Sequence, residues 1–311
     1  MNKVTIITTC YNDAANIKKY LINICSQTMQ PQEIIIVDGG SKDNTIELIE
    51  EYKSNNPSIP IRIIQDGRLN IAQGFNLGIK NADTELVCLT CIGNNFTNDM
   101  LMKLCEGIES GDYDACYGRM IGIDKGKFSH MYNKCFIGGS EGLPTMSNRC
   151  VLYNKRTFEI TGFFLENFFY AGEDAEFLKT FKDKGLVAKS IDDILVAWET
   201  PKNKKEYLKQ LKFYSIADLQ YQPILSQFLN KESLLLLIVL ILICCTYFFR
   251  YGIFVALFLL LLRILYTTIS KKLSFTYSIF YISREYIKLY YKFKYIKFCS
   301  PTNRVIREKK K

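Results

Sequence analysis

Short apolar runs alternate with longer segments of helical periodicity over roughly the first 200 residues. Ile34 to Val37 is a β-branched run without polar alternation, which is typical of a strand buried on both faces of a parallel sheet. A similar alternation of strand and helix patterns surrounds it and predicts a parallel sheet with right-handed crossovers. The other predicted strands are Val4 to Thr8, 59–66 and 85–91, and the predicted helices are 14–27, 45–53 and 70–82, the last with small residues on one side.

The pattern is less regular from residue 97 onward. A Gly-rich segment, 124–148, has no clear periodicity and is expected to be a loop region. The elements predicted around it are helices at 97–109, 154–160 and 175–184 and strands at 113–123 and 187–196.

Two apolar stretches, 234–249 and 253–269, follow the α/β part. Each is shorter than the roughly 20 residues that span a bilayer comfortably, so together they predict a tight transmembrane hairpin or a re-entrant pair. The alternative is a buried helical hairpin of a soluble protein. Lys271 and Lys272 follow directly, and the positive-inside rule then predicts a cytoplasmic location for both termini. We therefore expect three regions: an α/β domain at 1–225, the hairpin at 226–270 and a basic aromatic tail at 271–311.

The net charge of +9 is concentrated in that tail. From Lys271 onward there are 12 Lys and Arg against two acids, and the remainder is nearly neutral. Nucleic-acid binding by the main domain is therefore poorly supported, and no nucleic-acid partner is expected. The tail interleaves Tyr, Phe and Ile with Lys and Arg, so as a helix it would suit anionic membrane lipids; RNA binding is the alternative.

Cysteine usage favours a reduced, intracellular environment. The 11 cysteines are scattered, and several stand in apolar runs. Cys88 and Cys91 form a Cys-x-x-Cys pair, but no second pair follows at zinc-site spacing. The amino terminus has the pattern of a strand and not of a signal peptide.

Asp38-Gly39-Gly40-Ser41 ends the buried run at Val37. A carboxylate at the carboxyl end of a parallel strand, beside a helix start, lies where open α/β sheets bind nucleotides. Adjacent glycines allow a sharp turn and a close approach of a ligand to the backbone. An ordinary β-α turn with a capping acid would look the same when considered alone.

Four motifs in order strengthen the nucleotide interpretation: Thr9-Cys10-Tyr11-Asn12, IIIVDGGSKDNT, NIAQGFNLGIKNA and GFFLENFFYAGEDAEFLKTFKDKG. Over roughly residues 3 to 200 this arrangement resembles the family 2 glycosyltransferases of GT-A fold. The later stretch TPKNKKEYLKQLKFYSIADL is similar to the succinoglycan-type branch, which builds bacterial exopolysaccharides. The resemblance implies an α/β fold, namely a GT-A mixed sheet with flanking helices, carrying a C-terminal membrane hairpin.

The resemblance also implies roles for individual residues. The chemistry needs a nucleotide pocket, stabilisation of the departing diphosphate, and a base for the acceptor hydroxyl. Residues at the nucleotide-binding positions of the family are Thr9, Tyr11, Asn12, Asp38 and Gly40, and those lining the nucleotide and donor-sugar site are Asp66, Gln73 and Asn76. For the last three, helix capping and loop hydrogen bonding are the alternative.

Glu173-Asp174, at a predicted helix start, matches the catalytic position, with Asp174 as the base. One carboxylate suffices for an inverting transferase, because the acceptor oxygen displaces the leaving group in a single step. The preceding aromatic residues could desolvate the carboxylate and raise its pKa. A favourable interaction of the acids with the helix dipole is the alternative.

One departure from the family pattern concerns the metal. The family normally places Asp-x-Asp after the strand ELVCLT, whereas this chain has Cys91-Ile92-Gly93-Asn94 and no carboxylate between Glu85 and Asp99. Magnesium or manganese binding is therefore uncertain. Three possibilities stay open: the diphosphate and a more distant acid hold the metal, basic residues such as Arg149 or Lys202 replace it, or the enzyme is impaired. Trp198 also lacks the histidine that often accompanies it.

The sequence thus predicts a membrane-attached, cytoplasm-facing glycosyltransferase that moves a sugar from a nucleotide-sugar donor to a lipid-linked or surface-polysaccharide acceptor. Because the Asp-x-Asp is missing, a catalytically impaired member that scaffolds a polysaccharide-assembly complex is the principal rival. The donor sugar, its base and the acceptor are left open.

Overall fold

The computed structural model describes residues 3–138, 142–168, 170–221, 231–245 and 252–296. The chain divides into two compact units. The first comprises 1–124, 137–166 and 173–200, and the second comprises 125–136, 167–172 and 201–311. The predicted boundaries at 225 and 270 stay a prediction.

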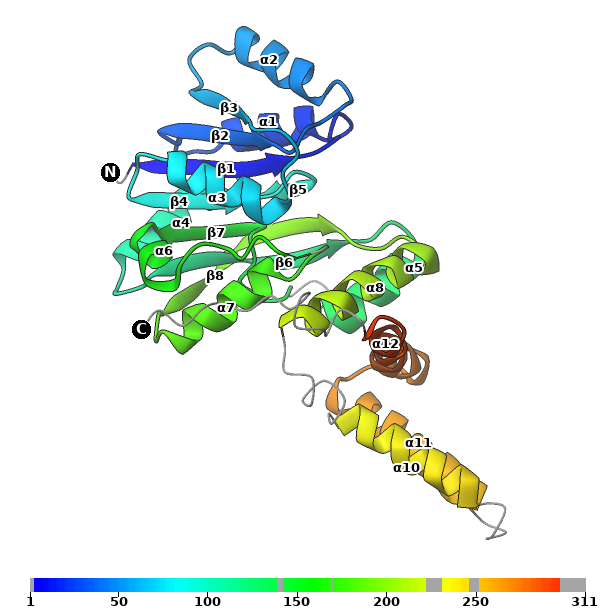
Figure 1. Ribbon diagram of the computed structural model, residues 1–311. Coiled ribbons are helices and arrows are strands. Elements are labelled where there is room, and N and C mark those ends of the chain that lie inside the picture. The colour runs from blue at the N-terminus through cyan, green and yellow to red at the C-terminus, as the bar shows by residue number, and fades with distance from the viewer. Residues whose placement is uncertain (1–2, 139–141, 169, 222–230, 246–251, 297–311) are drawn as a thin grey trace. The chain divides into compact units, whose positions relative to one another are not determined.

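The first unit is built on one mixed eight-stranded sheet (Figure 1). Its strand order is β3-β2-β1-β4-β7-β6-β8-β5, and the first four of these positions are occupied by parallel strands. Those four strands are β1 (Val4–Cys10), β2 (Glu33–Asp38), β3 (Ile61–Gln65) and β4 (Leu86–Thr90). The others are β5 (Asn94–Phe96), β6 (Ala115–Ile123), β7 (Cys150–Asn154) and β8 (Ala188–Glu199). The predicted α/β class and mixed sheet are confirmed.

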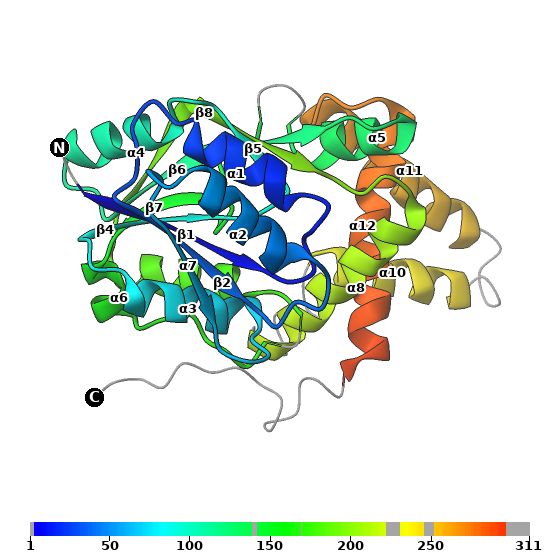
Figure 2. The same ribbon diagram turned by 90° about the horizontal axis from the view of Figure 1, so that it is seen from above.

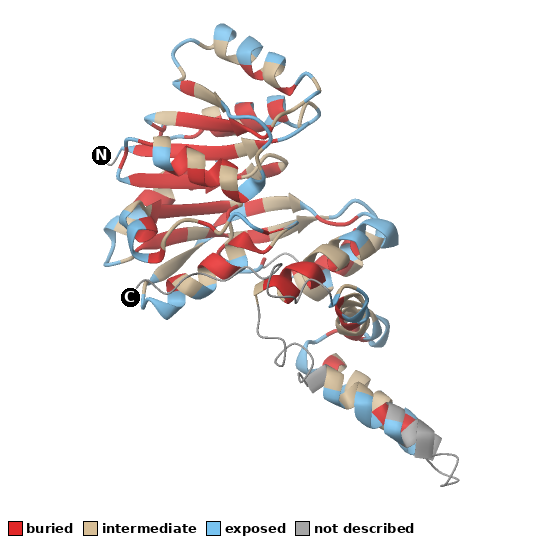
Figure 3. Ribbon diagram, in the orientation of Figure 1, coloured by how far each residue is buried: buried red, intermediate tan, exposed pale blue. Residues whose placement is uncertain are grey.

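Helices cover both faces of this sheet (Figure 2). One face packs against α1 (Ile17–Cys25), α2 (Thr45–Asn55) and α4 (Met100–Glu109). The other packs against α3 (Ile71–Asn81), α6 (Arg156–Thr161) and α7 (Glu173–Asp183). The central strands are buried on both faces (Figure 3), and Ile34, Ile35 and Ile36 are all 0% exposed, as the uninterrupted apolar run predicts.

Small residues let α3 lie close to β1. A Cβ atom added at Gly78 would come 2.4 Å from Cγ2 of Ile7, and one at Gly74 would come 2.6 Å from Cγ2 of Thr9. Ile7 is 0% exposed and β-branched, so its side chain has little freedom to move aside. The glycines thus bring the helix against the strand that carries the Thr9 motif.

We expect Gly78→Ala to destabilise the first unit by up to about 2 kcal/mol, because overpacking costs about 1–3 kcal/mol and the better helix propensity of alanine returns about 1 kcal/mol. Thermal or urea unfolding of the two forms measures this difference. An increased unfolding free energy would contradict the close approach of α3 to β1.

The sequence analysis missed several described elements, among them β5, β7 and the helices at Lys127–Phe136 and Lys204–Tyr221. Strands β5 and β7 are short, at three and five residues, and neither has a distinct alternating pattern. Both are stabilised by pairing with distant segments, β5 with β8 and β7 with β4 and β6. The segment 124–148, which was expected to be a loop, contains the helix α5 (Lys127–Phe136).

The second unit is helical. Besides α5 it contains α8 (Lys204–Tyr221), α10 (Lys231–Cys245), α11 (Gly252–Ser270) and α12 (Phe275–Lys294). Helices α10 and α11 pack on each other, and α11 exposes large apolar side chains such as Phe254, Leu257 and Phe258. Arg250, between the two apolar stretches of the predicted hairpin, lies outside the described residues.

Among the described helices, none by itself has the length and apolar composition needed to cross a bilayer. A pair, Phe254–Ser270 with Phe275–Lys294, meets the length and composition criteria jointly, with a bend of 110° between them. The finding supports a helical region with apolar character, and membrane insertion is taken up below as a proposal.

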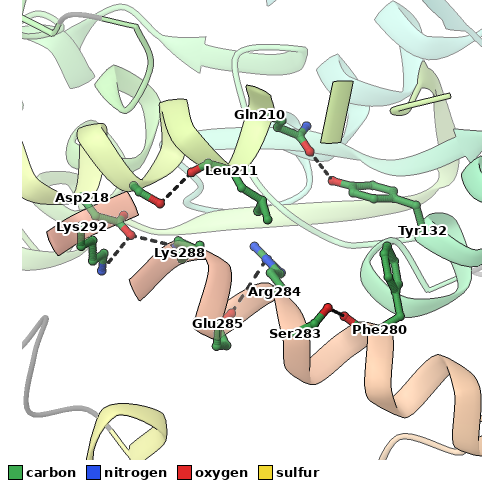
Figure 4. A network of polar contacts seen from close by, with 11 residues as sticks. Tyr132, Gln210, Leu211, Asp218, Phe280, Ser283, Arg284, Glu285, Lys288 and Lys292 are labelled. Carbon is green, nitrogen blue, oxygen red and sulfur yellow. Dashed lines mark hydrogen bonds and ion pairs between the residues drawn. The ribbon is translucent and has the colours of Figure 1, made fainter. Parts of the chain in front are cut away.

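Helix α12 is tied to α8 by a buried ion pair (Figure 4). Lys288 Nζ lies 2.8 Å and Lys292 Nζ 3.2 Å from Oδ2 of Asp218, and the three side chains are 16%, 9% and 15% exposed. Close to it, the hydroxyl of Tyr132 in α5 donates to Gln210 in α8 over 3.0 Å. The tail was predicted as a surface element, but two of its lysines are therefore engaged within the protein.

We expect Asp218→Asn to destabilise the second unit by about 3 kcal/mol, because removing one partner of a buried ion pair leaves uncompensated charge. Glu285→Gln is the control, since Glu285 is 41% exposed and lies 3.9 Å from Arg284, and exposed pairs contribute about 0–1 kcal/mol. Thermal unfolding in detergent compares the two variants. Equal melting temperatures would contradict a stabilising role for the Asp218 pair.

Candidate active site

The predicted nucleotide-binding residues meet at one edge of the sheet. Strands β1, β2 and β3 are parallel, and the register pairs Cys10 with Asp38 and Asp38 with Gln65 at their carboxyl ends. The segments that follow these strands therefore leave the sheet side by side. Tyr11 and Asp66, both exposed, lie in two of these segments.

Asp38 organises the turn after β2. Its carboxylate is 2% exposed and accepts hydrogen bonds from the backbone N–H of Gly40 at 3.2 Å and of Ser41 at 3.1 Å. Gly40 has a φ of +86°, which favours glycine. A Cβ atom at Gly39 would come 2.9 Å from the carbonyl oxygen of Leu69, so the turn also packs closely on the segment before α3.

Asn12 connects the loop after β1 to the same turn. Its backbone N–H donates to Ser41 Oγ at 2.9 Å, and its side-chain Oδ1 accepts from the N–H of Lys42 at 2.8 Å. Asn12 has a positive φ of 55°, a conformation that Asn tolerates better than most residues. The two loops are therefore held as one rigid edge.

Asp13 lies at the same sheet edge and was not selected by the sequence analysis. It accepts from the N–H of Tyr11 at 3.0 Å, and its own N–H donates to Thr45 Oγ1 at 2.8 Å. Burial raises the pKa of Asp13, the Tyr11 N–H opposes the shift, and the nearby charge of Asp43 adds to it. Its position directly after the Thr9–Asn12 motif was the available signal.

Thr9, Gln73 and Asn76 lie where β1 meets α3, but the two α3 side chains are engaged within the protein. Gln73 forms a capping box with Asn70, each side chain accepting from the other's N–H at 2.9 Å. Asn76 is buried, donates to Glu166 Oε1 at 2.7 Å and accepts from the N–H of Phe164 at 3.0 Å. The alternative roles of capping and loop hydrogen bonding are thus observed, and donor contact stays a prediction.

Asp174 stands at the start of α7, after the buried Glu173. Its Oδ1 accepts from the N–H of Ala175 at 2.8 Å, and its Oδ2 lies 3.5 Å from Ser147 Oγ. Burial raises the pKa of the Asp174 carboxyl, opposed by the Ala175 N–H and the charge of Arg149. A carboxylate of raised basicity suits proton abstraction from a hydroxyl. Ser147 lies in an irregular segment, and no sequence signal indicated it.

Cys91 directly follows β4. The pKa of its thiol is raised to about 12, chiefly by burial; the charge of Arg149 opposes this rise, and the charges of Glu173, Asp174 and Asp13 contribute to it. Strand β4 runs parallel to β1, so the loop after β1 leaves the sheet at the same end as Cys91. Asp174 lies 3.5 Å from Ser147, the residue before Asn148. The thiol donates to the carbonyl oxygen of Asn148 at 3.4 Å.

The residues at this strand end do not fit a divalent metal. A thiol with so high a pKa is neutral, Gly93 has no side chain, and the side-chain Nδ2 of Asn94 donates to the Cys91 carbonyl oxygen at 2.9 Å. Within the described ranges no group of three or more His, Cys, Asp or Glu residues could hold a metal ion. Hard cations need several oxygen ligands, and these residues do not supply them.

Comparison with protein families assigns the chain. The model of the family described as "Glycosyl transferase family 2" matches residues 5–173. The chain belongs to glycosyl transferase family 2. This membership confirms the predicted enzyme class, a glycosyltransferase. The match covers the Asp38 turn and ends at Glu173.

Relatives of the family 2 chain share part of its length. The poly-beta-1,6-N-acetyl-D-glucosamine synthase of Staphylococcus aureus strain COL is 39% identical over 87 residues, which are 28% of this chain and 21% of the synthase. Glycosyltransferase GlyG of Streptococcus pneumoniae serotype 4 is 25% identical over 122 residues, 39% of this chain and 40% of that protein. This chain therefore spans about a fifth of the synthase it matches.

Solved structures share the fold. The mannosyltransferase PcManGT of Pyrobaculum calidifontis, in complex with GDP-Man and Mn²⁺, has a TM-score of 0.63 at 17% identity, covering 95% of this chain and 87% of that one. Staphylococcus aureus TarS has a TM-score of 0.51 at 17% identity, covering 70% and 39%. At this identity the likeness supports a GT-A-like sheet and leaves substrates undetermined.

Proposed function

We propose that the protein transfers a sugar from a nucleotide-sugar donor to a lipid-linked or surface-polysaccharide acceptor, with inversion. The observation that carries the proposal is the common sheet edge. The Asp38 turn and Cys91 follow strands that are both parallel to β1, at their carboxyl ends. Cys91 contacts Asn148, and the neighbouring Ser147 contacts the partly buried Asp174. A nucleotide at the first and an acceptor hydroxyl at the second would bring the reacting atoms together.

The residues suggest a single displacement. Asp174 takes the proton of the acceptor hydroxyl, and the oxygen attacks the anomeric carbon of the donor. The new glycosidic bond forms as the bond from that carbon to the diphosphate oxygen breaks, and the nucleoside diphosphate leaves. Buried surroundings that raise the pKa of Asp174 make it a stronger base for this step.

An acceptor linked to a lipid suits the second unit. Helix α11 exposes Phe254, Leu257 and Phe258, and Lys271 and Lys272 after it are exposed. Exposed apolar surface of this kind, followed by basic residues, favours attachment to the cytoplasmic face of an anionic membrane. Similarity to a poly-beta-1,6-N-acetyl-D-glucosamine synthase supports a glycan acceptor, and the succinoglycan-type branch stays a prediction.

A scaffold without activity is the second candidate, favoured by the absence of an acid pair at Cys91 and Gly93. Calorimetry separates the two. The detergent-solubilised chain is titrated with UDP-, GDP- and dTDP-sugars, and the transferase must bind one of them. Failure to bind any, together with no nucleotide release in the presence of lipid-linked acceptor extract, would contradict the proposed function and favour the scaffold.

A further inference from the structure

Arg149 lies opposite Cys91 at the end of β4. Strand β7 runs antiparallel to β4, and the register pairs Thr90 with Cys150. One residue beyond that pair, Cys91 leaves β4 and Arg149 enters β7. The hydrogen bond from Cys91 Sγ to the Asn148 carbonyl at 3.4 Å agrees with this placement, as do the effects of the Arg149 charge on the pKa values of both Cys91 and Asp174.

The guanidinium of Arg149 has no acidic partner among the described residues. Its contact there is with the ring of Trp198, whose centroid lies 4.3 Å from Cζ. Three other arginines of the first unit are ion-paired: Arg62 with Glu33, Arg119 with Asp192 and Arg156 with Asp114. Arg149 is thus a half-buried cation that is oriented by an aromatic ring and whose charge no carboxylate neutralises by direct contact.

Sugar transfer from a nucleotide donor requires positive charge beside the departing diphosphate. A departing nucleoside diphosphate gains negative charge as the bond to the sugar breaks, and donors or cations already in position stabilise it. The neutral Cys91 thiol and Gly93 do not supply a metal site. We propose that the Arg149 guanidinium binds the diphosphate of the donor and stabilises it in place of a divalent cation, an inference that rests on the proposed function.

The side chains fit this role. Guanidinium groups bind phosphates through two parallel N–H···O bonds, which a lysine cannot reproduce. Trp198 acts as a positioning residue, because its ring holds the guanidinium plane. Strand pairing fixes the ring, since Trp198 pairs with Asn94 of β5 and with Gly122 of β6.

Arg68 is the principal competitor within the first unit. It is exposed, and its Cα would lie 3.6 Å from a Cβ atom added at Gly40, so it is close to the Asp38 turn. Unlike Arg149, it is not among the described contacts with an aromatic ring, and it is not among the charges that shift the pKa of Asp174. An experiment that compares both arginines distinguishes a phosphate contact at the turn from one beside the catalytic carboxylate.

Calorimetry on the full chain in detergent tests the proposal. The probes are UDP, GDP and dTDP with their nucleosides, each with EDTA or with Mn²⁺. We expect the wild type to bind one diphosphate with an affinity that EDTA changes less than about threefold. Arg149→Gln should weaken diphosphate binding about 10- to 100-fold and leave nucleoside binding unchanged, as expected for lost charged hydrogen bonds. Arg149→Lys, which keeps the charge, should show a smaller loss.

Arg156→Gln is the matched control, because Arg156 lies beyond the other end of β7 and its side chain is 59% exposed. Diphosphate binding that collapses in EDTA, that survives Arg149→Gln, or that is lost in Arg68→Gln instead would overturn the proposal and leave the transferase function standing. A wild type that binds no nucleotide under either condition would contradict the proposed function itself.

Discussion

Asp174→Asn is expected to lower kcat/KM for sugar transfer by about 10²- to 10⁴-fold, because a positioned general base contributes that much to proton transfer. Nucleotide affinity should stay within about threefold of wild type, since the carboxylate acts on the acceptor hydroxyl. Steady-state kinetics and calorimetry measure the two quantities separately. Asp183→Asn, exposed near the end of the same helix, is the control. A variant that keeps wild-type turnover would exclude Asp174 as the base.

The raised pKa of Asp174 adds a pH dependence. The base is active when ionised, so kcat/KM of the wild type should fall as the pH is lowered through a value above the ordinary pKa of an aspartic acid, about 3.9. Residual activity of Asp174→Asn should lack this acidic limb. Glu173→Gln tests the neighbouring acid, and an acidic limb lost in that variant alone would transfer the role to Glu173.

Stability should change in the opposite sense. Burial favours the protonated form of Asp174 in the folded chain. The contribution of Asp174 to the free energy of unfolding is therefore fully present below its pKa in the unfolded chain, and it is lost as the pH rises through its higher pKa in the folded chain. At neutral pH the wild type therefore carries a buried ionised carboxylate that Asp174→Asn removes. Thermal melts should place the variant above the wild type at pH 7, with the difference vanishing below about pH 4.

Asp38→Asn is expected to weaken nucleotide binding by more than about tenfold and to lower the unfolding free energy by about 1.5–3 kcal/mol. The carboxylate accepts from the N–H groups of both Gly40 and Ser41, and an amide replaces one of its acceptor atoms with a donor facing them. The turn would then lose the shape that the nucleotide contacts.

Calorimetry below the melting temperature separates the loss of binding from the loss of folded protein in this variant. Glu47→Gln, exposed in the first turn of α2, serves as the control and should bind as the wild type does. Wild-type affinity in folded Asp38→Asn would show that the turn does not contribute to the nucleotide site.

Local patterns explain why much of the fold could be predicted. The uninterrupted run at Ile34 to Val37 indicated a central parallel strand, and its pairing with β1 and β3 confirms this. The turn at Asp38 followed from the same stretch, because its hydrogen bonds join residues two and three positions apart. Information of this range is contained in any short segment of sequence.

Long-range pairing explains what could not be predicted. Ser147 reaches Asp174 only because β7 lies between β4 and β6 in the sheet. The sequence of β7 does not predict this position, because the strand has five residues and no distinct pattern. The contact between Arg149 and Trp198 likewise depends on segments that are far apart in the chain. Gln73 and Asn76 show that a motif can also predict too much. Their motif positions suggest contact with a ligand, whereas their side chains form a helix cap and support a loop.

Transfer of label from a radioactive nucleotide sugar tests the central claim most directly. The full chain in detergent is incubated with the donor that it binds and with lipid-linked glycan extract, beside Asp174→Asn. The account predicts that label appears in the lipid-extractable glycan with the wild type, continues to do so in EDTA, and falls by at least about 10²-fold in the variant. Label that remains on the nucleotide despite tight binding would contradict it.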